Sequence, residues 1–209
     1  GPTGAGKTTI VNLISRFYNI EEGTVSIDGH SVMDVTLHSL RSQMGIMLQD
    51  SFVFSGTIAD NIRYGRLDAS NEDIVRVSKL LCADEFISKL PHGYETIVKE
   101  RGGGLSQGQK QLIAFARTLL ADPKILVLDE ATSSIDTSTE QLLQRGINLL
   151  LEGRTSFIIA HRLSTIKSCT RIMYVDGGQI KESGSHEELM AKKGYYYDLY
   201  MAQYRKDET

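Results

Sequence analysis

The N-terminal stretch GPTGAGKTT constrains the fold of this chain more than any other part of its sequence. Gly1, Gly6, Lys7 and Thr8 satisfy the pattern G-x-x-x-x-G-K-[ST], and the following TIVNLISRFY has apolar residues at helical spacing. Glycines let successive backbone N–H groups curl around a phosphate, because no Cβ stands in the way. The lysine can reach outer phosphate oxygens, and the threonine hydroxyl can ligate Mg²⁺. The stretch predicts a phosphate-binding loop that leads into a helix, against the alternative of a chance glycine turn.

Length and composition indicate an ordinary globular chain. Its 209 residues are 41% hydrophobic and 23% charged, which is enough for a buried core. The net charge of −3 gives no overall basic field, so nucleic acid is not an expected partner. Two cysteines far apart in sequence fit a reducing compartment better than a disulfide scaffold. No stretch approaches the roughly 18 apolar residues of a membrane span.

Strands and helices are predicted to alternate on both sides of a helical middle region. The expected strands are 44–50, 124–130 and 154–161, with hairpins at 24–32 and 171–184. The expected helices are 57–65, 70–90, one that begins after Ser106, 137–153 and 186–204. This alternation predicts an α/β fold with a parallel core sheet.

The stretch ILVLDE supplies the carboxylates that a phosphate loop needs. Four apolar residues, 125–128, are typical of a buried central strand, which would deliver Asp129 to its carboxyl end, where ligands bind in open α/β sheets. Asp129 can hold magnesium, and Glu130 could act as a general base on water. Taken alone, the stretch is more often a strand end with solvated acids. Its occurrence together with the phosphate loop favours the catalytic interpretation.

A second anion site is indicated by LSQGQ, at 105–109. Ser106 is a good helix N-cap, and the run that follows it would begin a helix whose first N–H groups point outward. Such a helix end attracts anions. The bulky Gln107 stands in the middle of this site.

In that order, GPTGAGKTT, LSQGQ and ILVLDEATSSID resemble the nucleotide-binding domain of an ABC transporter. The stretches DSFVFSGTIADNIRYG, PHGYETIVKERGGGLS and IIAHRLSTI resemble the exporter branch, and the likeness covers the chain from Gly1 to about Tyr204. The resemblance implies a P-loop NTPase core with a mainly parallel sheet, antiparallel β elements and an inserted α-helical signature subdomain. The subdomain would span about 50–120, and the core 1–49 and 121–209. Because the family's first strands would precede Gly1, we expect an N-terminally truncated domain.

The resemblance also implies a role for each motif residue. Glu130, His161 and Gln49 would be catalytic, as base, γ-phosphate sensor and partner of Mg²⁺ and water. Thr8, Gln49 and Asp129 would hold Mg²⁺. The residues implied to bind ATP within the chain are Gly1, Pro2, Thr3, Gly4, Ala5, Gly6, Lys7, Thr8 and Thr9, and those implied to bind it in a partner are Ser106, Gln107, Gly108, Gln109 and Asp136.

In the resemblance, two such domains dimerise head to tail, and each signature helix caps the γ-phosphate bound by the other. The usual signature is LSGGQ, and here Gln107 replaces its first glycine. A side chain there would crowd a docked phosphate, while Lys7, Asp129, Glu130 and His161 are intact. We therefore favour an asymmetric heterodimer. A homodimer that tolerates the glutamine is the alternative.

The implied function is the ATP-hydrolysing motor of an exporter at the cytoplasmic face of the cell membrane. Its further partners would be the coupling helices of a transmembrane domain, which the segment 100–102 is expected to touch. A soluble ABC ATPase is the first alternative, although neither heptad arrays nor a basic arm is present. A non-hydrolysing, ATP-gated interaction module is the second, and Glu130 and His161 argue against it.

Overall fold

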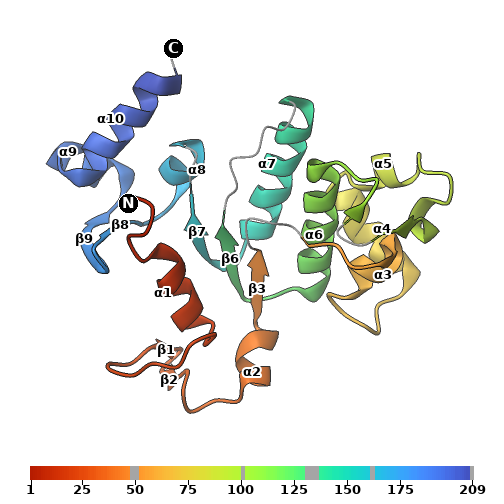
Figure 1. Ribbon diagram of the computed structural model, residues 1–209, viewed down its shortest axis with the longest axis horizontal. Helices are drawn as coiled ribbons and strands as arrows, with labels where there is room; N and C mark the ends of the chain where they lie inside the picture. The colour runs from red at the N-terminus through yellow and green to blue at the C-terminus, as the bar shows by residue number, and fades with distance from the viewer. Residues whose placement is uncertain (48–51, 100–101, 130–136, 161–162, 208–209) are drawn as a thin grey trace. The chain divides into compact units, whose positions relative to one another are not determined.

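The computed structural model describes residues 1–47, 52–99, 102–129, 137–160 and 163–207 (Figure 1). The chain forms two compact units, Gly1–Leu40 with Ile158–Thr209, and Arg41–Phe157. Within the described part of the chain, no helix is long and apolar enough to cross a bilayer. The predicted boundaries of the helical subdomain stay a prediction.

The first unit contains the helix after the phosphate loop and two β-hairpins. Its elements are α1 (Lys7–Ile14), β1 (Ser26–Ile27), β2 (His30–Ser31), most of α2 (Leu37–Ser42), the end of β7 (Thr155–Ile159), α8 (Leu163–Ser168), β8 (Ile172–Asp176), β9 (Gln179–Gly184), α9 (His186–Lys192) and α10 (Tyr195–Asp207). Ile172, Leu189 and Tyr196 form a buried cluster that joins the second hairpin to α9 and α10.

Both hairpins predicted from the sequence are confirmed. β1 pairs antiparallel with β2 around Asp28-Gly29, and β8 with β9 around Gly177-Gly178. All four turn residues have positive φ, between 51° and 81°. Two-residue turns of this kind match the twist of the flanking strands, which is why Asp-Gly and Gly-Gly favour them.

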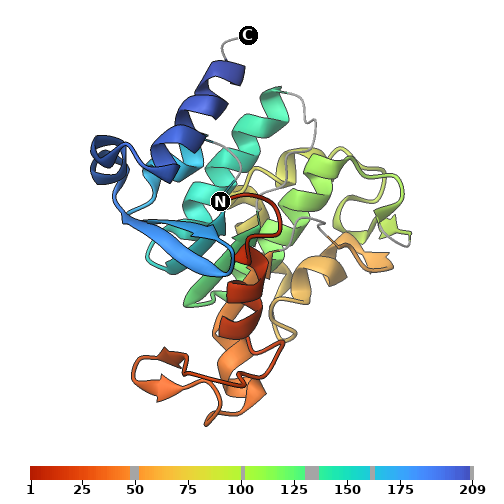
Figure 2. The same cartoon turned by 60° about the vertical axis from the view of Figure 1, so that its left-hand side comes forward.

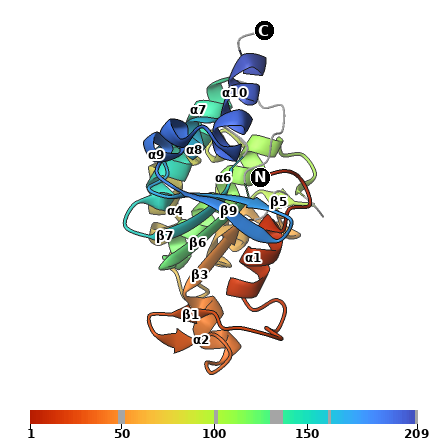
Figure 3. The ribbon, with the colours of Figure 1, turned by 90° about the vertical axis from the view of Figure 1, so that its left-hand side faces the viewer.

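The second unit combines a parallel sheet with helices. Its elements are β3 (Met44–Met47), β4 (Gly56–Thr57), α3 (Ile58–Arg63), α4 (Asn71–Leu80), α5 (Asp84–Ile87), η1 (Gly93–Glu95), β5 (Ile97–Val98), α6 (Gln107–Ala121), β6 (Ile125–Asp129), α7 (Thr137–Leu151) and the start of β7. The sheet order is β3-β6-β7 (Figure 3). β3 and β6 are parallel, with Met44 opposite Ile125 and Met47 opposite Leu128, as the buried apolar run at 125–128 predicted.

Helix α6 is the centre of the second unit, and α3, α4 and α7 all contact it (Figure 1). Ile58 and Ile62 of α3, Ile74 of α4 and Ile113 of α6 are each at most 1% exposed. These side chains lie where the apolar stripes of amphipathic helices meet. Helix α6 is therefore packed against other helices of this unit on more than one of its sides.

Two predicted helices are wrong in extent, because each is interrupted by a left-handed residue. The helix predicted for 70–90 ends at Leu80, and Cys82 has a φ of 56°. The helix predicted for 186–204 ends at Lys192, and Lys193 has a φ of 53°. A left-handed residue stops the helical hydrogen-bond ladder. Apolar periodicity does not report it, because cysteine and lysine give no local signal for this conformation.

Candidate functional site

The phosphate loop forms a turn whose glycines take conformations that other residues avoid. Gly6 is the residue before α1, with a φ of 104°, and it provides no side-chain cap to the helix. The first N–H groups of α1 therefore have no side-chain acceptor at the N-cap, which leaves a positive helix end for an anion. This geometry is the one that the glycine pattern predicted.

Lys7 bends back over its own loop. Its Nζ donates hydrogen bonds to the carbonyl oxygens of Gly1 at 2.8 Å and Pro2 at 2.7 Å. The ammonium group is thereby held beside the loop rather than extended into solvent. A phosphate oxygen in the loop would be a stronger, charged acceptor for the same ammonium group.

The turn of the β8–β9 hairpin contacts the phosphate loop, and no sequence motif predicts this contact. The N–H group of Gly178 donates to the carbonyl oxygen of Ala5 at 3.1 Å, and Ala5 is only 5% exposed. A Cβ on Gly6 would lie 3.5 Å from the Cα of Gly178. Figure 2 shows the hairpin beside the start of α1. The repeated glycines at the turn predict a hairpin but not this contact.

Asp129 is the last residue of β6, at the carboxyl end of the strand, as predicted. Its side chain is half-buried, after four buried residues. Gln49, Glu130, His161 and Asp136 lie outside the described residues, so their predicted roles stay predictions.

The signature segment begins α6 with a complete capping box. The N–H group of Gln109 donates to Ser106 Oγ at 3.2 Å, and that of Ser106 donates to Gln109 Oε1 at 2.9 Å. The Ser106 hydroxyl accepts here, so its proton remains available to another acceptor. The predicted N-cap is confirmed.

Gln107 is the first residue of α6 and is half-buried, and Gly108 beside it is buried. Glutamine is a good helix former, so Gln107 places no strain on its own chain. Any steric cost of the Gln107 side chain would arise when an external group, such as a phosphate, approaches this end of α6. In this structure the loop residues lie in the first unit, and Asp129 and the signature lie in the second.

Comparison with known proteins identifies the family. The sequence model of the ABC transporter family matches residues 1–133. This chain belongs to the ABC transporter family.

Its relatives are described as ATP-binding components of ABC transporters. It is 57% identical over 204 residues to the uncharacterised ABC transporter ATP-binding protein YknV of Bacillus subtilis, a match covering 98% of this chain and 34% of that protein. It is 53% identical over 199 residues to a fatty acid ABC transporter ATP-binding/permease protein of Mycobacterium bovis, covering 95% and 32% of the two chains. The chain thus spans about a third of the length of these relatives.

The fold also matches a solved ABC exporter. A bacterial Atm1-family ABC exporter with ATP bound superposes with a TM-score of 0.89 at 45% identity, covering 97% of this chain and 36% of that one. The match confirms the predicted fold class, an ABC ATPase with parallel and antiparallel β elements. The predicted membership of the exporter branch is confirmed with it, and the nucleotide-binding character of the domain follows from the family.

Proposed function

We propose that this domain is the ATP-hydrolysing motor of an exporter, which moves a substrate across a membrane through ATP-dependent head-to-tail dimerisation. The observation that carries the proposal is the phosphate loop, with Lys7 over its carbonyl oxygens and the uncapped start of α1 behind it. A relative from Syntrophus aciditrophicus that is 46% identical is described as an ATP-dependent lipid A-core flippase, which supports an ATP-driven function.

Within one chain, the loop amides and Lys7 would hold the phosphates of ATP. Thr8, Asp129 and Gln49 would hold Mg²⁺, and their hydroxyl, carboxylate and amide oxygens are the hard ligands that this ion prefers. When bound, Mg²⁺ neutralises charge on the β and γ oxygens. Glu130 would accept a proton from the attacking water, and His161 would contact the γ-phosphate.

The signature would act on ATP bound by a partner. The capping box leaves the Ser106 proton available to a phosphate oxygen, and Gln107, Gly108 and Gln109 stand at the same helix end. Asp136 would approach the same partner. The Gln107 side chain would limit the approach of the partner's γ-phosphate, so we propose a heterodimer in which this signature serves the slower of two sites.

An exposed aromatic group supports contact with the coupling helices of a transmembrane domain. Phe52 and Phe54 lie edge to face at 4.9 Å, and Phe54 stacks on Tyr64 at 4.6 Å. Phe52 is 52% exposed and Tyr64 60%. Clustered exposed aromatic side chains mark protein interfaces. The domain would dock there from the cytoplasmic face of the membrane, with 100–102 as a second contact.

ATP turnover by the full-length chain in lipid vesicles tests this function. The chain should be measured alone and with a neighbouring half-transporter, with Glu130→Gln as the control that removes the base. Loss of a general base costs about 10²–10⁴ in rate, so the control should fall close to background. If wild type and Glu130→Gln hydrolyse ATP equally, the catalytic proposal is wrong and a non-hydrolysing module remains.

The same measurement tests the dimer. Turnover that requires the second half-transporter supports the heterodimer, and Gln107→Gly should then raise turnover at the slower site. Equal turnover by the chain alone, unchanged by Gln107→Gly, would mean a homodimer that tolerates the glutamine.

A further inference from the structure

The side chain of Asn61, in α3, forms hydrogen bonds with the backbone of the segment that follows residues 48–51. Its Oδ1 accepts from the N–H group of Phe54 at 2.8 Å, and its Nδ2 donates to the carbonyl oxygens of Phe54 and Thr57, both at 3.0 Å. The side chain is buried, and the residue is only 1% exposed. Asn61 thus pairs with both backbone groups of Phe54, as a neighbouring strand would.

Arg117, in helix α6, also hydrogen-bonds to Asn61 and to the segment that begins at Phe52. Its Nη1 donates to the carbonyl oxygen of Phe52 at 3.1 Å, its Nε to that of Asn61 at 2.9 Å, and its Nη2 to Asn61 Oδ1 at 3.1 Å. The guanidinium also lies 5.1 Å from the ring centroid of Phe54. These contacts connect two segments that are 56 and 65 residues away from Arg117 in sequence.

The contacts of Arg117 are unusual for a half-buried cation. Among the described residues it makes no ion pair, and the acceptors of its hydrogen bonds are neutral oxygens. Burial lowers the pKa of the guanidinium. A planar group with donors in fixed directions specifies where each oxygen must lie, which a methyl-rich side chain of similar volume would not do.

Helix α3 also approaches the backbone of α6 at this residue. A Cβ on Gly65, just after α3, would lie 2.0 Å from the carbonyl oxygen of Arg117. Arg117 is ten residues along α6 from Gln107, which corresponds to about 15 Å of continuous helix. A displacement at Arg117 is therefore carried to the signature end of the helix.

We propose that Arg117 is a positioning residue, which fixes the signature helix α6 to the segment Phe52–Phe54 so that the two move together. The proposal rests on the function proposed above, since it links the exposed aromatic side chains of Phe52, Phe54 and Tyr64 to the residues that would meet a partner's phosphate. Arg117 touches neither nucleotide nor metal in this role. It acts through α6.

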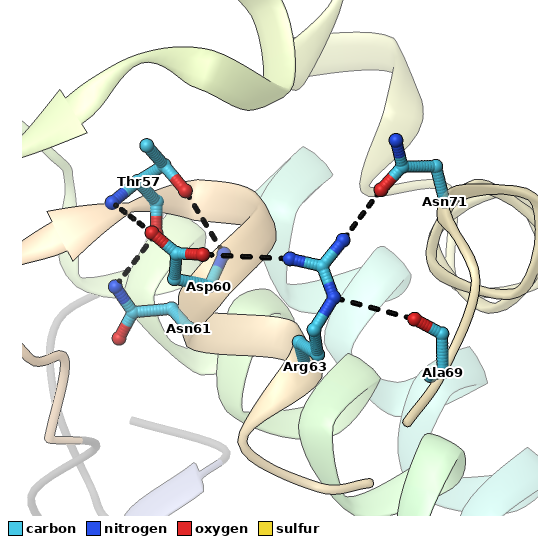
Figure 4. Close-up of polar contacts among 6 residues, drawn as sticks. All are labelled: Thr57, Asp60, Asn61, Arg63, Ala69 and Asn71. Carbon is cyan, nitrogen blue, oxygen red and sulfur yellow. Dashed lines mark hydrogen bonds and ion pairs between the residues drawn. The ribbon is translucent and has the colours of Figure 1, made fainter. Parts of the chain in front are cut away.

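Arg117→Lys in the full-length chain tests the proposal, because lysine keeps the charge and the stem but not the planar fork. Arg63→Lys is the matched control. Arg63 also binds a carbonyl oxygen, that of Ala69 at 3.3 Å, and the side chains of Asp60 and Asn71, but it joins α3 to the start of α4 rather than to α6 (Figure 4).

Amide hydrogen exchange gives the readout that does not depend on activity. Losing these bonds should speed exchange about 10- to 100-fold at the hydrogen-bonded amides of Phe54, Ser106 and Gln109 in Arg117→Lys. Arg63→Lys should speed exchange near 69–73 only. Unchanged exchange at 106–109 in Arg117→Lys would overturn the link between the two segments.

Turnover in lipid vesicles gives the second readout. For Arg117→Lys we expect kcat for ATP to fall about 10- to 100-fold, with Mg·ADP affinity unchanged, because ADP needs only the phosphate loop. Arg63→Lys should keep both the wild-type kcat for ATP and the wild-type affinity for Mg·ADP. An unchanged kcat, or a parallel loss of ADP affinity, would contradict the positioning role. Absence of turnover in the wild type would instead count against the proposed function, while the exchange result would still decide this proposal.

Discussion

At the scale of single residues, Asn61 is a buried amide whose hydrogen-bond donors and acceptors are all satisfied. Its two donor and two acceptor positions meet Phe54, Thr57 and Arg117. A buried side chain with this many partners stabilises only when all of them are present. The residue stands in a helix where asparagine has no local advantage.

Asn61→Leu should therefore destabilise the protein strongly. Leucine has a similar volume, but it leaves the partly buried groups around it without partners, at a cost of about 3 kcal/mol in the free energy of unfolding. Urea denaturation of wild type and variant measures the difference. Asn19→Leu, at an exposed position, should change stability by less than about 0.5 kcal/mol. Equal urea midpoints for Asn61→Leu and wild type would contradict the account of the buried amide.

At the scale of elements, Arg154 ties the end of α6 to the end of α7. It donates to Asp122 Oδ1 at 2.7 Å, to the carbonyl oxygen of Pro123 at 2.9 Å and to that of Leu150 at 2.9 Å. Asp122 is the left-handed residue that ends α6. The hydrogen bond from Arg154 holds the pKa of Asp122 below its usual value, with Lys124 adding to the effect.

This pKa shift predicts a loss of stability in acid. Because the folded state lowers the pKa of Asp122, its contribution is fully present above the unfolded value of about 4 and is lost as the pH falls below that. Asp122 is 66% exposed, so the effect should not exceed about 1 kcal/mol. Urea midpoints from pH 7 to pH 3 measure it.

Asp122→Asn should flatten this part of the pH profile. Asp68→Asn, whose side chain is 90% exposed and 3.7 Å from Arg66, is the control and should keep the wild-type profile. A profile that stays as steep in Asp122→Asn as in wild type would rule out the Asp122–Arg154 pair as its source.

At the scale of the whole molecule, nucleotide binding should be visible as stability. A ligand that binds only the folded state adds about 2.7 kcal/mol at 100 times its Kd. Lys7→Met in the full-length chain should lose most of this, because the ammonium group that now binds Gly1 and Pro2 is absent. The measurement is the melting temperature with and without Mg·ADP.

Lys181→Met provides the matched control for that shift. Lys181 lies in the same unit, and its ammonium group contacts only the nearby Gln179 at 2.7 Å among the described residues. We expect it to retain the full nucleotide-induced shift. If Lys7→Met also retains it, the loop binds nucleotide without its lysine, and the site assignment needs revision.

The predictable part of this protein consists of features encoded over short stretches. The hairpin turns, the N-cap at Ser106 and the apolar strand 125–128 all appear where the sequence indicated them. The family motifs likewise indicated the phosphate loop and Asp129. The left-handed breaks at Cys82 and Lys193 were missed, because neither residue type signals that conformation.

The phosphate loop, the helix starts and the family could be predicted from the sequence, because each depends on residues within a few positions of one another. The hydrogen bond from Gly178 to Ala5, and those from Arg117 to Phe52 and Asn61, could be found only in the folded chain. Those contacts join residues that lie 56 or more positions apart. No local periodicity encodes such a pairing, because it exists only after the chain has buried its apolar faces and brought distant backbone groups within hydrogen-bonding distance.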